Sequence, residues 1–367
     1  SSAGGDVRQR NKPVRVTVKI VHLTQHYRPH VGGVERHVER VARLLSERGH
    51  AVTVMAGDHA GDLPETEHDG ALTIERFPAT RSLWRMKAWF VRRLPALWRA
   101  DAVHVHTAAF FTMLPRAVWP RGKTVYTAHG WGGRYPIPPE SVRRTRRVVR
   151  RASKLVCIGD FIGKWYGVDP DMVSYGAVEP PPLHRVEREA DRVCMVGRLA
   201  EDTGAAMFAR GLRQAADRGR RIAVTVCGDG VLADEVRDRL THERIDLNWR
   251  GFVTDPERSM AAAAVTLTSG YLGILEALAM GSSVVAAADN PVKEDYLGLS
   301  PMASFIGIAR SPAEVADRVE AALDNPDPQR RREGEAFARS QTWDRLVDGY
   351  ERLYREVSSR TNGSSSP

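Results

Sequence analysis

Short apolar runs alternate with amphipathic segments along the chain. In the first half, runs rich in β-branched residues predict strands at residues 14–24, 51–55, 72–77, 102–106, 123–128 and 154–158. After the first of them, residues 34–48 carry apolar side chains on one face, which predicts a helix that ends before Gly49. The second half repeats this order, with strands predicted at residues 192–196, 222–227, 246–252, 265–268, 284–288 and 303–306. Strands that alternate with helices predict parallel sheets covered by helices.

Three consecutive prolines, Pro180 to Pro182, separate the two series. They predict a linker, because proline can continue neither a helix nor a central strand. We therefore expect an α/β protein with two doubly wound domains, residues 14–180 and 181–340. Residues 341–358 predict a helix that packs back across the linker. Residues 1–13 and 359–367 are polar and are expected to be disordered tails.

The stretch from residue 265 to 288, VTLTSGYLGILEALAMGSSVVAAA, has the order strand, glycine loop, helix, strand, with the helix predicted at residues 272–280. Ligands of parallel sheets bind at the carboxyl ends of the strands. Gly270 and Gly273 would let a phosphate approach the amides at the start of this helix. Glu276 follows among apolar residues, where a dry carboxylate needs a partner. The alternative is that Glu276 merely complements the helix dipole.

Charge adds information about partners. The 367 residues carry a formal net charge of +9, which favours anionic ligands and surfaces. No apolar run is long enough to span a bilayer and no signal peptide opens the chain, so we expect a cytoplasmic protein. Arginine runs also suggest nucleic-acid binding, but no recognised nucleic-acid-binding motif supports it, and we expect no nucleic-acid partner.

Two segments are strongly basic. Residues 81–99, RSLWRMKAWFVRRLPALWR, combine three tryptophans with six cations, and residues 143–151, RRTRRVVRR, contain six arginines. Aromatic residues beside lysine and arginine are typical of a segment at a membrane surface, so we expect a peripheral protein at the inner face of the membrane. The alternative is a pair of ordinary domain helices with solvated arginines. Pro95 is expected to break the first segment.

Eight blocks occur in an order that resembles a known family: VGGVERHVERVARLLSERGHAVTV, DAVHVHT, VYTAHG, VCMVGRL, VTVCGDG, RGFV, LEALAMGSSVVA and TWDRLVDGYERLYREV. Together they resemble the retaining glycosyltransferases of the family four type, glycosyl transferases group 1, with the GT-B fold. The resemblance implies two Rossmann-like domains facing a central cleft, the first on the acceptor side and the second binding a nucleotide sugar. It implies transfer of a sugar to an acceptor hydroxyl with retention, from a donor such as a UDP- or GDP-sugar. The acceptor would be a sugar, a lipid-linked or a phosphorylated molecule.

The resemblance also assigns roles to residues. Catalysis would involve His129 beside the transferred sugar, Arg198 on the diphosphate and Glu276 on the ribose. The expected donor-binding residues are Gly32, Gly33, Arg198, Thr203, Arg250, Phe252, Val253, Ser269, Gly270, Tyr271, Leu272, Gly273 and Glu276. The acceptor side would comprise His106, His129 and Trp131. The family needs no metal or cofactor, and we see no metal-ligand cluster in the sequence.

Two positions depart from the family pattern. Thr203 replaces a lysine that contacts the diphosphate, and Thr268 replaces the first of two glutamates. One interpretation is a pseudoenzyme; the other, which we favour, is a sub-lineage in which hydroxyls, loop amides and Tyr271 hold the donor. A sugar-nucleotide epimerase is a further alternative, although the lost glutamate argues against it.

His104 and His106 form a further pattern. They alternate along one predicted strand and therefore point the same way. A zinc site would need further ligands nearby, so we expect both histidines to line the cleft or the core.

Overall fold

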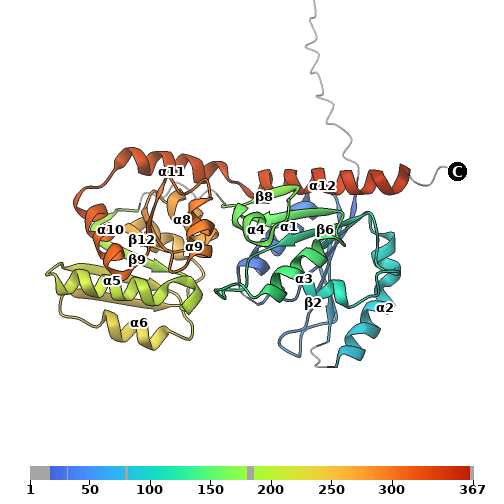
Figure 1. The fold of residues 1–367 in the computed structure, drawn as a ribbon, viewed down its shortest axis with the longest axis horizontal. Helices are drawn as coiled ribbons and strands as arrows, with labels where there is room; N and C mark the ends of the chain where they lie inside the picture. Colours follow the sequence, from blue (N-terminus) through green and yellow to red (C-terminus); the bar gives the residue numbers. More distant parts are fainter. Residues whose placement is uncertain (1–16, 31, 79–81, 180–185, 364–367) are drawn as a thin grey trace, which may run out of the picture.

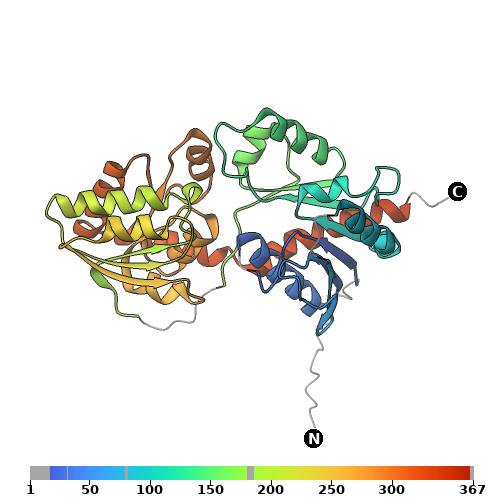
Figure 2. The ribbon, with the colours of Figure 1, turned by 90° about the horizontal axis from the view of Figure 1, so that it is seen from below.

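The structure is a computed structural model that describes residues 17–30, 32–78, 82–179 and 186–363. Figures 1 and 2 show two separate α/β halves, each built on its own sheet, with the long C-terminal helix lying along the first half. The linker prolines and the predicted tail at residues 1–13 lie outside the described residues.

The first sheet has eight strands in the order β3-β4-β2-β1-β5-β6-β7-β8. Neighbouring strands are parallel except for β3 and β4, which pair antiparallel at one edge. The strands are β1 (Lys19–Leu23), β2 (Ala51–Gly57), β3 (Thr66–Asp69), β4 (Leu72–Phe77), β5 (Ala102–Val105), β6 (Thr124–Ala128), β7 (Lys154–Ile158) and β8 (Met172–Ser174).

Two separate apolar clusters cover the faces of this sheet. On one face lie α1 (Gly33–Glu47) and α12 (Trp343–Gly363), whose apolar stripes pack together on the strands. On the other face lie α2 (Leu83–Arg99), the short 3₁₀ helix η1 (Ala108–Thr112), α3 (Pro139–Val149) and α4 (Asp160–Tyr166). The C-terminal helix therefore completes the core of the first half although it follows the second half in sequence.

The second sheet has six parallel strands in the order β11-β10-β9-β12-β13-β14. They are β9 (Glu189–Val196), β10 (Ile222–Cys227), β11 (Ile245–Gly251), β12 (Ala263–Leu267), β13 (Ser283–Ala287) and β14 (Ile306–Ala309). One face is covered by α5 (Ala205–Asp217), α6 (Ala233–Leu240) and α10 (Pro312–Asp324). The other is covered by α7 (Pro256–Ala262), α8 (Tyr271–Ala279), α9 (Pro291–Gly298) and α11 (Pro328–Ser340).

The predicted fold class, α/β with two parallel-sheet domains, is confirmed. Some element boundaries were wrong. The strand predicted at 303–306 begins only at Ile306, because residues 300–305 form turns through backbone bonds such as Phe305 N–H to Met302 O. Strands β3 and β8 were not predicted, and α12 extends to Gly363, into the tail expected to be disordered from residue 359.

Pro95 does not break its segment. The helix α2 runs through it without interruption from Leu83 to Arg99. Phe90 and Leu97, on either side of Pro95, are both fully buried in the core, and this packing outweighs the hydrogen bond that proline cannot donate. The prediction of a break was therefore wrong.

Candidate functional site

The two halves meet where α1 and α8 begin. Leu272, in the first turn of α8, lies against two glycines of the first half. A Cβ on Gly33 would lie 4.0 Å from Leu272 Cδ1, and one on Gly176 would lie 2.6 Å from Leu272 Cδ2. Gly176 has φ of +90°, so a side chain there would be strained as well as crowded. The glycine loops that the sequence predicted as donor-binding thus face each other from the two halves.

One ion pair joins the two helices at this junction. Glu276 of α8 is only 6% exposed, and its Oε1 lies 2.6 Å from Nη1 of Arg36 in α1. Burial raises the pKa of Glu276, and the positive charge of Arg36 partly opposes that shift. Within the residues that the structure describes, this is the one ion pair of Glu276. The sequence predicted that Glu276 needs a partner but did not identify Arg36. The available signal for Arg36 was its place in the first turn of the helix that follows Gly33.

Arg198 follows β9 and lies at the boundary of the two halves. Its Nη2 contacts Asp202 Oδ2 at 2.8 Å, and the side chain is otherwise exposed. A Cβ on Gly133 of the first half would lie 3.1 Å from Asp202 Cβ, so the loop after Trp131 closes against this residue. Arg198 can therefore reach an anion bound between the halves.

The hydroxyl of Thr203 is engaged within its own turn, and its predicted contact with the donor stays a prediction. It ends the short 3₁₀ helix η2 (Glu201–Thr203), and its Oγ1 donates to the carbonyl oxygens of Arg198 and Ala200, each at 2.7 Å. The hydroxyl proton is held within this turn. A threonine here shapes the loop that carries Arg198 but supplies no positive charge.

The first turn of α8 packs against α9. The amide of Tyr271 donates to the hydroxyl of Tyr296 at 2.9 Å, the two rings stack with centroids 3.9 Å apart, and Tyr271 is buried. Ser269 is also buried and accepts a hydrogen bond from the amide of Ala287 at 2.9 Å. The side chains of Tyr271 and Ser269 are thus engaged in packing, so the prediction that Tyr271 handles the donor finds no support in this geometry.

Glycines 270 and 273 differ in how much space surrounds them. Nothing lies within 4 Å of a Cβ placed on Gly270, whereas one on Gly273 would lie 2.5 Å from Thr268 Oγ1. Gly270 therefore leaves room for a ligand at the N-terminus of α8. Thr268, where the family carries its first glutamate, instead packs closely against the helix backbone.

The predicted base-binding residues lie at the end of β11. Phe252 is 59% exposed, which is unusual for a phenylalanine and leaves its ring free to contact a ligand. Arg250 donates from Nη1 to Ser259 Oγ at 2.9 Å, and Val253 packs at the edge of the apolar cluster beneath.

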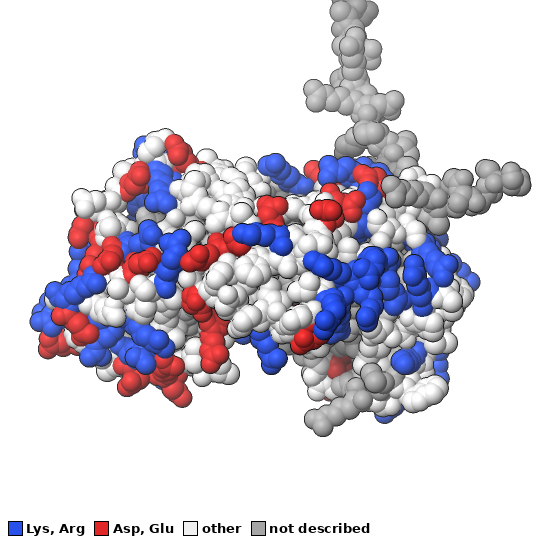
Figure 3. All heavy atoms as spheres, viewed as in Figure 1, with Lys and Arg blue, Asp and Glu red and all other residues white. Residues whose placement is uncertain are grey.

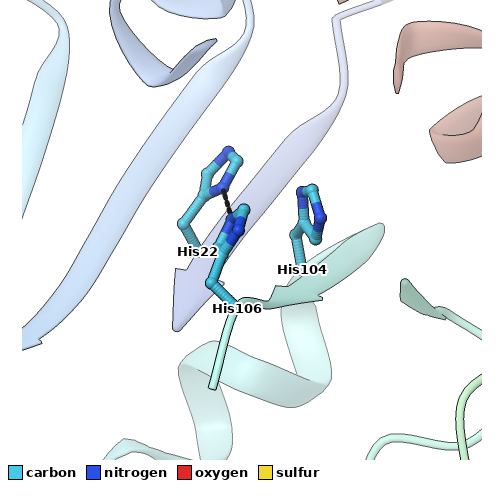
Figure 4. A group of neighbouring side chains, drawn as sticks. All are labelled: His22, His104 and His106. Atoms are coloured by element: carbon cyan, nitrogen blue, oxygen red, sulfur yellow. Dashed lines mark hydrogen bonds between the residues drawn. The ribbon is translucent and has the colours of Figure 1, made fainter. Parts of the chain in front are cut away.

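A chain of histidines runs from the junction into the first half. His129 follows β6, and its Nε2 lies 2.9 Å from His106 Nδ1. His106 Nε2 lies 3.0 Å from His22 Nδ1, as the dashed line in Figure 4 shows. His104 contacts the hydroxyls of Tyr354 and Thr127 at 2.6 and 2.7 Å. The sequence identified His104 and His106 as a pair but missed His22 of β1, which the parallel register places opposite His104.

Burial controls the charge of these imidazoles. It lowers the pKa values of His104, His106 and His129 well below the usual range, and neighbouring histidines lower them further. The same two causes lower the pKa of His22 to about 3. All four rings are therefore neutral near pH 7. His129 and Trp131 are partly exposed at the junction, whereas His106 is buried behind His129.

His22, His104 and His106 also correct an expectation. Their nearest ring nitrogens lie within 4.8 Å of one another, close enough for three ligands of one metal ion, although no metal-ligand cluster was expected from the sequence. Both nitrogens of His104 and both of His106 already have hydrogen-bond partners. A metal would have to displace some of these bonds. His22 and His106 are hydrogen-bonded to each other, whereas His104 bonds to Tyr354 and Thr127 and only packs against the ring of His106.

Comparisons with known proteins agree with this architecture. The Glycosyltransferase Family 4 model matches residues 31–171, and the Glycosyl transferases group 1 model matches residues 190–325. No curated protein sequence gave a significant match.

Several solved structures share the fold at low identity. Sucrose-phosphate synthase from Thermosynechococcus elongatus is 15% identical with a TM-score of 0.73, covering 93% of this chain and 99% of that one. HepE of Anabaena, in complex with UDP and glucose, is 15% identical with a TM-score of 0.68, covering 92% and 99%. An α,α-trehalose-phosphate synthase (UDP-forming) from Burkholderia vietnamiensis is 16% identical with a TM-score of 0.67, covering 94% and 100%.

The two family models fall in order on the two halves and together cover most of the chain. The solved structures match over both halves at once. The chain therefore belongs to the family 4, group 1 glycosyltransferases of the GT-B fold.

Proposed function

We propose that this glycosyltransferase binds a UDP-sugar between its two halves and transfers the sugar to an acceptor hydroxyl with retention of configuration. The observation that carries the proposal is the buried carboxylate of Glu276, held by Arg36 at the point where two glycine-led helices face each other. The complexes of HepE with UDP and with UDP-glucose support uridine as the base.

Each part of the donor has a group of matching chemistry. Glu276 Oε1 is held by Arg36, which leaves Oε2 to accept hydrogen bonds from ribose hydroxyls. Arg198 would neutralise the diphosphate as it becomes the leaving group, the kind of electrostatic stabilisation that dominates many enzymatic rates. The exposed ring of Phe252 can contact the base, and neutral His129 can donate or accept a hydrogen bond at the transferred sugar.

A thermal-shift panel tests the donor assignment. UDP, GDP, their glucose derivatives and the parent nucleosides are each added to the full chain. A ligand at about a hundred times its dissociation constant should raise the free energy of unfolding by roughly 2.7 kcal/mol, which is readily measured. Stabilisation by UDP and UDP-glucose is the expected result, and transfer products analysed by NMR would then reveal the anomeric configuration. No stabilisation by any nucleoside diphosphate would contradict the proposal.

Glu276→Gln should weaken UDP binding about tenfold or more, because a charge-assisted hydrogen bond to the ribose is lost. Isothermal titration calorimetry measures the change. Glu257→Gln is the matched control. Like Glu276, Glu257 belongs to the second half and faces Arg36, with its Oε1 3.8 Å from Nη2, but it is more exposed. Equal UDP affinity in wild type and Glu276→Gln would rule out the ribose contact.

We further propose that the first half docks on an anionic membrane surface. None of the described helices combines the length and the apolar composition needed to cross a bilayer. Helix α2, however, exposes an apolar stripe spaced four and three residues apart: Trp84, Ala88, Val91, Pro95 and Trp98. Trp84 is 83% and Trp98 51% exposed, whereas Trp89 is buried in the core. An exposed stripe of this kind, flanked by cations, is typical of a helix lying at a membrane surface.

Helix α3 adds positive charge on the same face of the sheet as α2. Figure 3 shows a broad basic area over α3 on the first half. Among the described residues, Arg143, Arg144, Arg147 and Arg150 have no acidic partner within ion-pair distance. Arg151 differs, since its guanidinium donates to backbone carbonyls of η1 and the following loop. The four unpaired arginines are free to meet anionic head groups, where a lipid-linked or phosphorylated acceptor would be concentrated.

Co-sedimentation with vesicles tests this docking. The chain should bind vesicles that contain anionic lipid at low salt and release them as salt rises, because screening weakens each contact. Arg144→Ser with Arg147→Ser should lower the partition coefficient by roughly thirtyfold, at about 1 kcal/mol for each cation. Trp84→Ser should also lower it.

Val231→Ser serves as the control, since Val231 is an equally exposed apolar residue of the second half. It should leave vesicle binding unchanged. Absence of binding to anionic vesicles at low salt would leave α2 and α3 as solvated helices.

A further inference from the structure

Lys293, in the first turn of α9, is a buried cation that the fold does not neutralise. It is 7% exposed, and its ammonium makes a single hydrogen bond within the part of the chain that the structure describes, a long contact of 3.5 Å to the carbonyl oxygen of Asp202. No carboxylate of a described residue lies within ion-pair distance. The ammonium also lies over the ring of Tyr296, 4.5 Å from its centroid. A buried ammonium with three donors and one weak acceptor is costly unless something else pairs with it.

Lys293 and Arg198 approach the same residue from different elements. Arg198 contacts the carboxylate of Asp202, while Lys293 contacts its backbone carbonyl. The two cations are close enough to repel each other, since Arg198 contributes to lowering the pKa of Lys293. Asp202 in turn lies under the loop of the first half that contains Gly133. The two positive groups therefore border one place at the junction of the halves.

Lysine is rare in the second half of the sequence. The chain uses arginine almost throughout its second half, and Lys293 is the only lysine after Lys164. A compact ammonium fits beneath a phosphate in a tight space, whereas a guanidinium requires room for its planar fork. The hydroxyl of Thr203, at the position where the family pattern has a lysine, donates to backbone carbonyls and carries no charge.

We propose that Lys293 is the second diphosphate-binding cation of this enzyme, acting from α9 together with Arg198. The inference rests on the proposed function, because it places the donor's diphosphate beside Asp202. A diphosphate bound there would supply the oxygen acceptors that the ammonium lacks in the free protein. The burial that makes Lys293 costly without a ligand would strengthen its attraction for the phosphate oxygens, since the local dielectric is low.

Calorimetry on the full chain with Lys293→Met tests the proposal. Methionine keeps the length of the side chain but removes the charge. The affinity for UDP should fall by tenfold or more, whereas the affinity for uridine, which has no phosphate, should stay the same. The melting temperature should be unchanged or higher, because a buried charge has been removed. Lys164→Met is the matched control. Lys164 of α4 is largely exposed and forms an ion pair with Asp295, which lies on α9 as Lys293 does.

The outcomes separate this inference from the proposed function. If wild type binds UDP and Lys293→Met binds it equally well, Lys293 is not a diphosphate ligand although the donor assignment stands. Equal loss of UDP and uridine affinity in the variant would indicate a distorted fold and would also overturn the inference. If wild type binds neither UDP nor GDP, the donor assignment fails, and the role of Lys293 fails with it.

The pH dependence of UDP affinity provides a second measurement. Burial above all, with a smaller contribution from the positive charge of Arg198, lowers the pKa of Lys293 to about 8, although the negative charges of Asp202 and Asp289 oppose the shift. A bound diphosphate would raise this pKa, so UDP should bind most tightly below pH 8 and more weakly as the pH rises above 8. The other groups that face the ammonium are Asp202, Asp289, Arg198 and Tyr296, residue types that ordinarily titrate far from pH 8. Lys293→Met, which has no titrating group at this position, should remove the dependence, and a fall of the same size in that variant would refute the proposal.

Discussion

Replacing Arg198 by alanine should lower kcat/KM for sugar transfer by about 100- to 1,000-fold, which corresponds to roughly 2.7–4 kcal/mol of transition-state stabilisation. Arg198 is exposed at the junction and, in the part of the chain that the structure describes, forms an ion pair only with Asp202. Charge grows on the diphosphate as the sugar leaves, so a cation positioned there stabilises the transition state more than the bound donor. We therefore expect the loss to appear in kcat as well as in KM.

Arg213→Ala is the control for this experiment. Arg213 forms the same type of ion pair, four residues apart, with Asp217 on α5, away from the junction. Its replacement should leave turnover within twofold of wild type. Wild-type turnover in Arg198→Ala would contradict the assignment. Absence of turnover in the wild type itself would instead reopen the interpretation that the chain is a pseudoenzyme.

Replacing Tyr350 by alanine should lower the free energy of unfolding by about 3–5 kcal/mol, the cost of deleting a large buried aromatic side chain. Tyr350 of α12 is fully buried in the core of the first half. Its hydroxyl also lies 2.9 Å from Nε2 of His37, which would lose its partner. Since most domains are stable by only about 5–15 kcal/mol, chemical denaturation should show the loss clearly.

Two variants separate the contributions of Tyr350. Tyr350→Phe keeps the ring and removes the hydroxyl, so it should cost about 1 kcal/mol. Arg352→Ala, an exposed position on the same helix, should change stability by less than about 0.5 kcal/mol. A small effect of Tyr350→Ala would mean that α12 contributes little to the first half. We would then expect a chain truncated before Trp343 to remain folded.

The histidine network explains why α12 matters beyond stability. Tyr350 contacts His37, and Tyr354 contacts His104. The ring of His104 packs against that of His106, with centroids 4.0 Å apart, and His106 contacts His129 at the junction. A helix that follows the second half in sequence thus supports the residue predicted to lie beside the transferred sugar. Perturbing Tyr350 should consequently affect both the stability of the first half and the position of His129.

The sequence by itself determined the class of fold and many of the elements. The runs at β4, β7 and β10 are short, and each places apolar and β-branched residues where the sheet is buried. Their predicted bounds match the structure. It also indicated Glu276, because a lone carboxylate in an apolar helix needs a partner whatever surrounds the helix. Such inferences succeed because they depend on neighbours within one or two turns of chain.

Only the tertiary structure decided which distant residues meet. Arg36 reaches Glu276, His22 joins His104 through strand register, and Lys293 approaches Asp202, although no local pattern links the members of these pairs. Tertiary packing also decided the helix around Pro95, which stays intact because Phe90 and Leu97 are buried. The spacing of apolar residues along a segment indicates which side of a helix or strand is buried. The partners of a buried charge, however, depend on how separate elements pack together. In this protein those partners lie where the two halves meet.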